Sequence, residues 1–129
     1  MARPESLKYT PSHEWVRVEG DIAVVGITDH AVEQLGDLAF VDLPAKGEKV
    51  EKGVPFGEIE STKSVSELFS PLSGEIVDVH DDLVENLLLI TTSPFGDGWM
   101  VRIRMSDPSE LDTLLSAEGY AAHLRTEEH

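Results

Sequence analysis

Two apolar-patterned segments flank a short polar run in the stretch Phe56-Gly57-Glu58-Ile59-Glu60-Ser61-Thr62-Lys63-Ser64-Val65-Ser66-Glu67-Leu68. Alternation of apolar and polar residues is typical of half-buried strands, so the stretch predicts a hairpin with one lysine, Lys63, at its tip. A lysine there can carry a cofactor on a flexible stem, clear of the fold. The ordinary alternative is a solvated turn lysine, and the rest of the sequence has to distinguish the two.

The charge balance of the chain is strongly acidic. It has 129 residues, of which 10 are Lys or Arg and 25 are Asp or Glu, for a formal net charge of -15. Such a balance argues against binding to nucleic acid or to an anionic membrane, because both need basic patches. It favours partners with basic docking faces, although a general solubility charge explains it equally well. The length and an apolar content of 40% predict one globular domain over residues 1–129.

Several site types and locations are excluded or disfavoured by absences in the sequence. There is no cysteine, which excludes disulfides, thiolate metal sites and cysteine nucleophiles. No apolar window reaches the length of about 18 residues that a transmembrane helix needs. The start, Met1 to Ser6, lacks the apolar core of a signal peptide and carries an acid early. A cytoplasmic protein is the simplest prediction, and a mitochondrial matrix protein whose transit peptide is absent is the alternative.

The pattern along the chain predicts many short strands with glycine turns. Thr28 has the character of an N-cap for a short helix over 29–35 that Gly36 stops. Residues 1–12 are expected to form a loop, and 82–90 are ambiguous but fit a short buried helix. Strands are expected at 14–18, 22–27, 38–43, 75–79 and 99–105, with further short strands between 46 and 70.

The end of the chain predicts a helical extension over about 107–127. Asp107 fits an N-cap, Pro108 the first helical position, and Glu110 the acid of a capping box. Leu111, Leu114 and Leu115 would form its apolar face. Gly119 is expected to interrupt the helix, with 120–127 continuing as a second short one that turns Tyr120 and Leu124 inward.

A weak internal repeat also bears on the fold. Gly47-Glu48-Lys49-Val50-Glu51 is similar to Gly74-Glu75-Ile76-Val77-Asp78, and the two copies lie on opposite sides of Lys63. A pseudo-two-fold sandwich with the lysine hairpin at one pole would produce this spacing, although a chance match of five residues is a fair competitor. The patterns together predict a mainly β protein, a small sandwich or barrel with helical additions.

A set of sequence blocks, in order, resembles one known family. The blocks are Ser12-His13-Glu14-Trp15-Val16, Gly26-Ile27-Thr28-Asp29-His30-Ala31, Leu35-Gly36-Asp37, Val41-Asp42-Leu43-Pro44, Phe56 to Lys63, Ser70-Pro71-Leu72-Ser73-Gly74-Glu75 and Pro94-Phe95-Gly96-Asp97-Gly98-Trp99. In this order and spacing, from about Leu7 to Leu124, they resemble the H proteins of the glycine cleavage system, which are lipoyl carriers.

The resemblance implies a specific fold and modification. The fold would be the barrel-sandwich hybrid of lipoyl and biotinyl carriers, with a short internal helix and C-terminal helices. Lys63 would carry lipoate in amide linkage, as N6-lipoyllysine. Biotin carriers usually present their lysine between methionines, whereas here the neighbours are Thr62 and Ser64, with Glu60 upstream. One departure from the family is the loss of an Asn-Pro pair, because Asn86 is followed by Leu87; we expect a more regular segment there, such as a longer helix.

The resemblance also implies the role of the protein and its partners. It would be a non-catalytic carrier subunit that takes the aminomethyl group of glycine from a pyridoxal-phosphate glycine decarboxylase. The arm would then visit a tetrahydrofolate-dependent aminomethyltransferase and be reoxidised by a flavin (FAD) dihydrolipoyl dehydrogenase. A lipoate ligase or lipoyltransferase would load Lys63. Glu14, Gln34 and Glu67 match positions near the cleft in which the family rests its arm, although each fits an exposed polar residue with no special role.

Other chemistries are weakly indicated. The five histidines include the groups His80-Asp81-Asp82 and Asp29-His30, but no metalloprotease, nucleophile-elbow or phosphate-loop motif is present. The histidines therefore favour solvated or capping roles, and no metal site is predicted. Trp15, Trp99 and Phe40 are expected in the core or a cleft wall. Two alternatives to the carrier hypothesis remain: a protein that relays lipoate to other lipoyl domains, and an enzyme with an unrecognised carboxylate or histidine site.

Overall fold

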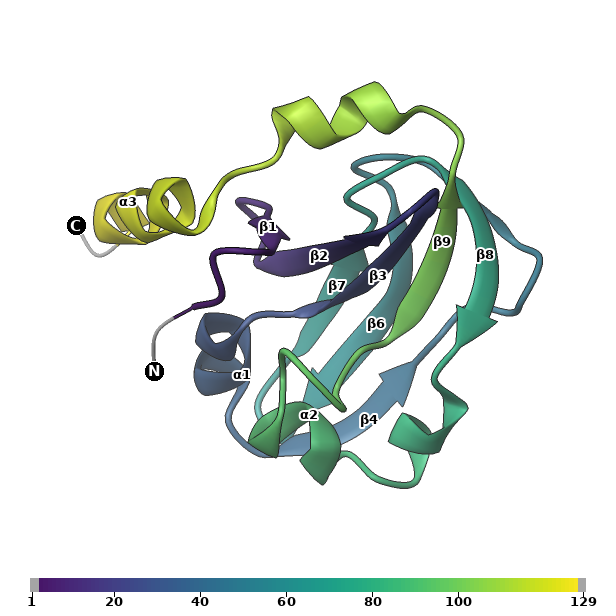
Figure 1. Ribbon diagram of the computed structural model, residues 1–129. Helices are drawn as coiled ribbons and strands as arrows, with labels where there is room; N and C mark the ends of the chain where they lie inside the picture. Colours follow the sequence, from purple (N-terminus) through teal and green to yellow (C-terminus); the bar gives the residue numbers. More distant parts are fainter. Residues whose placement is uncertain (1–2, 128–129) are drawn as a thin grey trace.

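Two β-sheets face each other, with helices at their edges (Figure 1). The computed structural model describes residues 3–127. One sheet has six strands in the order β1-β2-β3-β9-β8-β5, and the other has three in the order β4-β6-β7. The elements are β1 Lys8–Tyr9, β2 Glu14–Glu19, β3 Ile22–Ile27, α1 Asp29–Leu35, β4 Leu38–Asp42, β5 Lys49–Val50, β6 Pro55–Ser61, β7 Val65–Phe69, β8 Gly74–Val79, η1 Asp81–Val84, α2 Leu88–Thr92, β9 Val101–Met105, η2 Pro108–Thr113 and α3 Ala117–Glu127. The predicted mainly β sandwich with a short internal helix and C-terminal helices is confirmed.

The main core lies between the two sheets. It joins residues of the large sheet, such as Val25 and Ile103, with Ile59 and Leu68 of the small one, all at most 3% exposed. Strand β3 is apolar almost throughout because both of its faces are covered. Ala23 and Val25 enter this core, while Val24 belongs to a second cluster.

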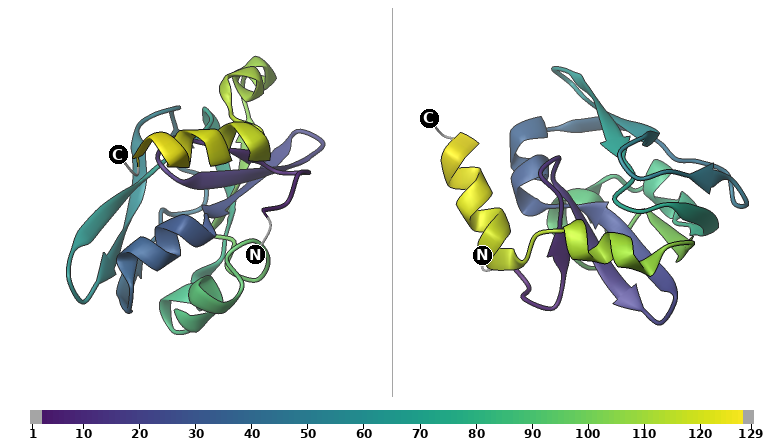
Figure 2. Two further views of the ribbon diagram at one scale, coloured as in Figure 1. Left: turned by 90° about the vertical axis from the view of Figure 1, so that its left-hand side faces the viewer. Right: turned by 90° about the horizontal axis from the view of Figure 1, so that it is seen from above.

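The second cluster forms under the C-terminal helix α3. Tyr120 stacks on Tyr9 with ring centroids 5.0 Å apart, and Leu124 packs beside them. The prediction that Tyr120 and Leu124 turn inward is confirmed. The expected interruption at Gly119 is wrong. Ser116 accepts a hydrogen bond from the Gly119 amide at 3.0 Å and so caps the helix, which places Gly119 in the first turn of one continuous α3. Figure 2 shows α3 lying along the outside of the sandwich.

Trp15 and Gly26 are paired across β2 and β3, and the glycine makes room for the indole. A Cβ at Gly26 would lie 2.7 Å from atoms of the Trp15 ring, so any side chain there would displace it. The Trp15 Nε1 donates to the Pro94 carbonyl at 2.8 Å and anchors the loop before β9. The block Pro94 to Trp99 is therefore held against the second cluster.

Three expectations about local structure are corrected. Residues 1–12 contain the short strand β1, because Lys8 and Tyr9 pair with β2. Residues 82–90 do not form one longer helix; a turn at 85–87 separates η1 from α2. Phe40 is 44% exposed on β4 and belongs to neither core nor cleft wall, whereas Trp15 is fully buried. Within residues 3–127 no helix is long and apolar enough to cross a membrane.

The capping box predicted at Asp107 is only half present. Asp107 does cap η2, since its carboxylate accepts from the Ser109 amide at 3.1 Å. Glu110 instead accepts from the amide and the hydroxyl of Ser73, at 2.7 and 2.9 Å. The carboxylate ties the C-terminal extension to the turn before β8, and this tertiary contact replaces the local one.

The two copies of the weak repeat pair with each other. Lys49 of β5 lies opposite Glu75 of β8, and Val50 lies opposite Gly74. These pairs flank the β6–β7 hairpin nearly symmetrically in sequence, with Glu60 opposite Val65 nearest its tip. This pairing agrees with the pseudo-two-fold arrangement that the repeat suggested.

Candidate functional site

Lys63 is exposed at the tip of the hairpin formed by β6 and β7. The hairpin projects from the body of the molecule beside α1 (Figure 2). The Thr62 amide donates to the Asp37 carbonyl at 3.0 Å and joins the tip to the turn after α1. The sequence prediction of a lysine on a hairpin tip is confirmed. The backbone of this tip is held both by the pairing of β6 with β7 and by the hydrogen bond from Thr62 to Asp37.

The hydroxyl of Ser61 builds the turn around Lys63. Its Oγ accepts from the Lys63 amide at 3.2 Å and from the Ser64 amide at 3.1 Å. The Ser61 amide in turn donates to the Ser64 carbonyl at 2.8 Å. A serine that accepts from amides two and three residues ahead is a side-chain turn, which orders the backbone without a glycine. Ser61 is 8% exposed, so water competes little for these bonds.

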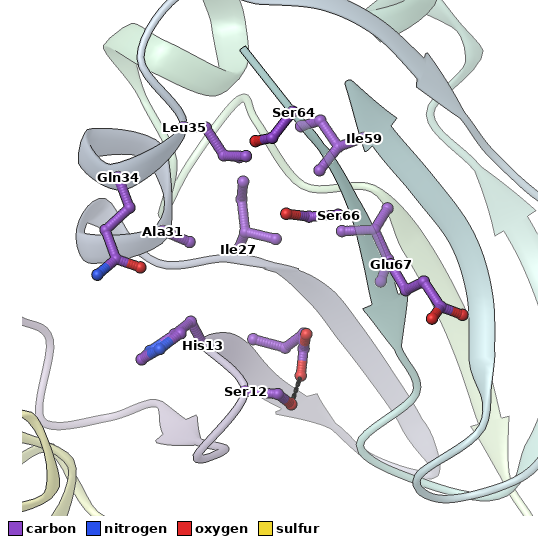
Figure 3. Close-up of a pocket in the computed structure, with 12 residues that line it drawn as sticks. Ser12, His13, Ile27, Ala31, Gln34, Leu35, Ile59, Ser64, Ser66 and Glu67 are labelled. Atoms are coloured by element: carbon purple, nitrogen blue, oxygen red, sulfur yellow. Dashed lines mark hydrogen bonds between the residues drawn. The ribbon is translucent and has the colours of Figure 1, made fainter. Parts of the chain in front are cut away.

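A pocket of about 260 Å³ opens next to this tip (Figure 3). Its apolar residues come from α1, β3, β6 and β7, and its polar residues come from α1, the start of β2 and the loop before it, the hairpin turn and β7. Ser64, the residue after Lys63, lies on its wall. The lining residues are Ser12, His13, Glu14, Ile27, Ala31, Gln34, Leu35, Ile59, Ser64, Ser66, Glu67 and Leu68.

Glu14 is the buried acid of this pocket, with 2% of its surface exposed. Its Oε1 accepts from the Thr10 hydroxyl at 2.7 Å and from the Ser12 hydroxyl at 2.6 Å, and Oε2 lies 3.4 Å from the Phe69 amide. Burial raises the pKa of Glu14 to about 7, although these hydrogen bonds oppose the rise. The carboxyl therefore changes charge near neutral pH.

Glu14, Gln34 and Glu67 all line the one pocket, but in different ways. Gln34 is exposed on the last turn of α1 and reaches the pocket from its side (Figure 3). Figure 3 shows the carboxylate of Glu67 pointing away from the pocket. Alternate residues of a strand face opposite sides, so on β7 it is Ser66, beside the buried Leu68, that faces inward.

The sequence missed several pocket residues. Ser64 and Ser66 could have been found from the strand alternation that marks Leu68 as buried. Ser12 and His13 could not, because they depend on a tight turn in which His13 has a φ of 76° and its amide donates to the Thr10 carbonyl. Burial lowers the pKa of His13, against the attraction of Glu127.

His80, which the sequence singled out together with Asp81 and Asp82, does not lie on this pocket. Its ring stacks on Trp99 with centroids 4.4 Å apart, and its Nδ1 lies 2.7 Å from the Trp99 carbonyl oxygen. These contacts hold the loop that precedes β9 and give His80 a structural role.

The outer face of the small sheet carries a row of acids below the hairpin tip. Asp42 lies opposite Glu58, and Glu58 lies opposite Glu67, all three exposed. Like charges directly across a sheet repel each other and cost stability. A basic protein surface would relieve that repulsion on contact.

Comparison with known proteins gives consistent matches over nearly the whole chain. The family model for glycine cleavage H-protein matches residues 7–127. A "Glycine cleavage system H protein" of Bacteroides fragilis is 50% identical over 122 residues, which are 95% of this chain and 97% of that protein. One of Rubrobacter xylanophilus is 51% identical over 125 residues, or 97% of each chain.

A plant protein and a solved structure match as well. A protein of Oryza sativa subsp. indica, described as "Glycine cleavage system H protein, mitochondrial", is 49% identical over 124 residues, 96% of this chain and 76% of that protein. The crystal structure of a glycine cleavage system H protein from Mycobacterium marinum superposes with a TM-score of 0.88 at 43% identity. It covers 95% of this chain and 99% of that one.

Proposed function

The chain belongs to the glycine cleavage H-protein family, and from this premise we propose that its Lys63 carries lipoate in amide linkage. The observation that carries the proposal is the exposed lysine on a projecting hairpin whose turn is ordered by Ser61. A modifying enzyme needs a lysine that it can reach and a backbone of fixed shape around it. The protein would then be a carrier subunit of glycine cleavage and not itself an enzyme.

The pocket beside the tip fits a neutral, largely apolar arm. Acylation removes the charge of the lysine, whose ammonium would otherwise resist burial. Ile27, Leu35 and Ile59 offer an apolar wall, and Ser64 places the pocket next to the attachment point. The pocket would shield a rested arm from water. The dithiolane of bound lipoate supplies the group-transfer and redox chemistry, and the chain supplies position.

Glu14 gives this pocket a carboxyl group whose ionisation can change with the charge of the bound arm. In its neutral form it suits an uncharged arm. In its ionised form it can pair with an ammonium group, such as the amine of an aminomethyl cargo, and a cation nearby would favour ionisation. We place Glu14 and the inward Ser66 against the arm, Gln34 at the side, and Glu67 on the outer docking face.

The partners that we propose follow from the family. They are the pyridoxal-phosphate glycine decarboxylase, the tetrahydrofolate-dependent aminomethyltransferase, the FAD dihydrolipoyl dehydrogenase and a lipoate ligase or lipoyltransferase. The acidic row of Asp42, Glu58 and Glu67 supports docking to basic faces close to the arm. Tethering then raises the effective concentration of the arm at each docked site. A cytoplasmic location stays a prediction of the sequence.

The test is loading of the purified protein with lipoate, ATP and a lipoate ligase, followed by intact mass and peptide mapping. We expect one lipoyl adduct, confined to Lys63 and lost in Lys63→Ala. Lys46→Ala is the matched control, because Lys46 is also an exposed turn lysine. An adduct on other lysines, or none on a folded wild-type protein, would contradict the carrier proposal. Glycine-dependent decarboxylation with the partner enzymes would follow.

A further inference from the structure

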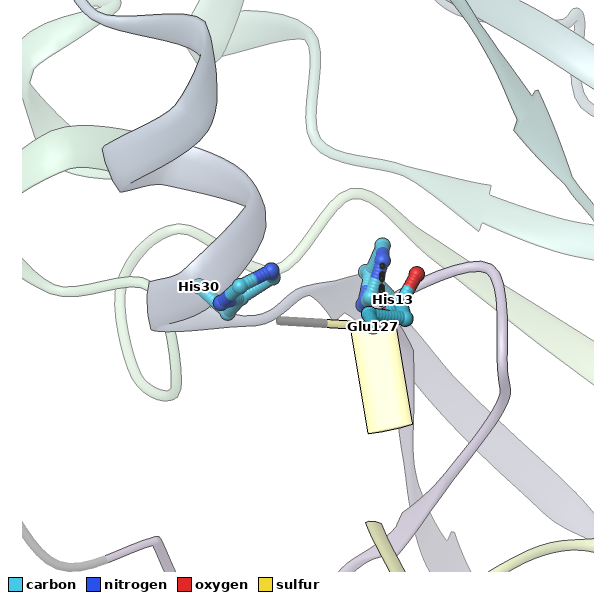
Figure 4. Close-up of side chains that lie close together, drawn as sticks. All are labelled: His13, His30 and Glu127. Carbon is cyan, nitrogen blue, oxygen red and sulfur yellow. Dashed lines mark ion pairs between the residues drawn. The ribbon is translucent and has the colours of Figure 1, made fainter. Parts of the chain in front are cut away.

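Three side chains from distant parts of the chain meet beside the pocket (Figure 4). His13 comes from the turn before β2, His30 from the first turn of α1, and Glu127 from the last turn of α3. One potential ligand atom from each lies within 4.8 Å of the other two. Two imidazoles and a carboxylate are a common ligand set for transition metals in proteins.

The atoms of His13 are arranged as in a metal ligand. Its Nδ1 lies 2.7 Å from the Tyr120 hydroxyl, and its Nε2 lies 3.4 Å from Glu127 Oε2. The Tyr120 oxygen is itself 2.8 Å from the Thr28 hydroxyl. A metal-bound imidazole usually has its second nitrogen fixed by such a partner, which sets the orientation of the ring.

His30 provides an independent observation. Its Nε2 is buried and has no hydrogen-bond partner within residues 3–127. Buried polar atoms are almost always satisfied, and an unpaired one calls for an explanation such as an ion or a water. The ring centroids of His30 and His13 are 4.7 Å apart, and one ring nitrogen of His30 lies within 4.8 Å of the candidate ligand atoms of His13 and Glu127.

We propose that His13, His30 and Glu127 form a binding site for a late first-row divalent ion of the Zn²⁺ class. Bonds from zinc to imidazole or carboxylate are about 2.0–2.2 Å long, so the three groups would move slightly together. Glu127 is exposed at the end of its helix and can make most of that adjustment. Three protein ligands leave a fourth position open to water.

The ion would join α3 and α1 to the turn at the pocket rim. His13 lines the pocket and is also a ligand, so the site adjoins the arm-binding region. His123 is a further neighbour, with Nε2 3.5 Å from Glu127 Oε2, and it shares that carboxylate when no ion is bound. The site does not depend on modification of Lys63.

The experiment is a titration of unmodified protein, first stripped with a chelator, with Zn²⁺ by calorimetry. We expect one Zn²⁺ per chain and at least tenfold weaker binding in His30→Gln and in Glu127→Gln. Glu118→Gln is the matched control, because Glu118 is an exposed acid on the same helix. Millimolar Mg²⁺ should not compete, because imidazole nitrogens do not suit that ion.

A second measurement identifies the ligand atoms. Nitrogen-15 spectra of the imidazoles should show Zn²⁺ shifting the Nε2 signals of His13 and His30 while the His80 signals stay in place. Glu127→Gln keeps the test open if His30→Gln does not fold. Binding that His30→Gln and Glu127→Gln leave unchanged would assign the ion to the acidic surface and overturn the proposal. Absence of binding would overturn it too, and would leave a water as the partner of His30.

Discussion

Replacing Glu14 with Gln should change how the stability of the protein depends on pH. Glu14 is buried, and its folded-state pKa is raised from 4.5 to about 7. The folded protein therefore prefers the neutral carboxyl. The contribution of the neutral Glu14 carboxyl to stability is full below pH 4.5, and it is lost progressively as the pH rises through about 7. Gln has nearly the same shape and no charge, so it removes this dependence.

The size of the effect follows from the two pKa values. Each unit of difference corresponds to about 1.4 kcal/mol between the protonation states. Between pH 5 and pH 8 the unfolded chain stays largely ionised while the folded carboxyl passes through its own pKa. The free energy of unfolding of the wild type should thus fall by about 2–3 kcal/mol relative to Glu14→Gln over that interval.

Urea denaturation followed by circular dichroism at pH 5, 6, 7 and 8 measures this difference directly. Other groups titrate in the same range, so the informative quantity is the wild-type value minus the variant value at each pH. Glu67→Gln controls for the change in net charge, because it removes an exposed carboxylate on β7 that points away from the pocket. If the difference in free energy of unfolding does not change with pH, or if the wild type becomes more stable relative to the variant as the pH rises, then Glu14 is not a buried acid that is neutral in the folded protein.

Three further substitutions test how the site is supported. Gly26→Ala should lower the free energy of unfolding by about 1–3 kcal/mol in the same urea assay, because its Cβ would press on the Trp15 ring from 2.7 Å. Ser61→Ala should slow lipoate attachment at Lys63 in a ligase time course, since the turn amides lose their acceptor, and an unchanged rate would show that the turn is not what the ligase recognises. Tyr120→Phe should cost about 1–3 kcal/mol, because it leaves a buried hydroxyl and an imidazole without their partner; thermal unfolding that matches the wild type would contradict this.

Elements with local signals were predictable from the sequence. Helix α1 begins after Thr28, whose hydroxyl accepts from the Ala31 amide, and ends at Gly36, whose φ of 75° favours glycine. The hairpin around Lys63 was also predictable from local signals, because the strand alternation and the polar turn lie within one short stretch of sequence. In both cases the residues that determine the structure are neighbours in the chain.

Features that depend on distant partners were not predictable. Glu110 has the spacing of a capping box, but its carboxylate accepts two hydrogen bonds from Ser73 in place of the local one at the start of the helix. Glycine has a low helix propensity, yet capping by Ser116 places Gly119 in the first turn of α3, where this costs the helix little stability. The meeting of His13 with His30 depends on the fold as a whole, because no spacing in the sequence brings them together.

The turn at Lys63 has one more consequence. Its hydrogen bonds come from the Ser61 side chain and from backbone groups, so the side chain at position 63 takes no part in them. The backbone conformation of the tip therefore does not depend on the identity of that side chain or on a group attached to it. For protein engineering, the hairpin is a display scaffold: a noncanonical amino acid or a synthetic prosthetic group could be placed at this position without redesigning the loop that presents it.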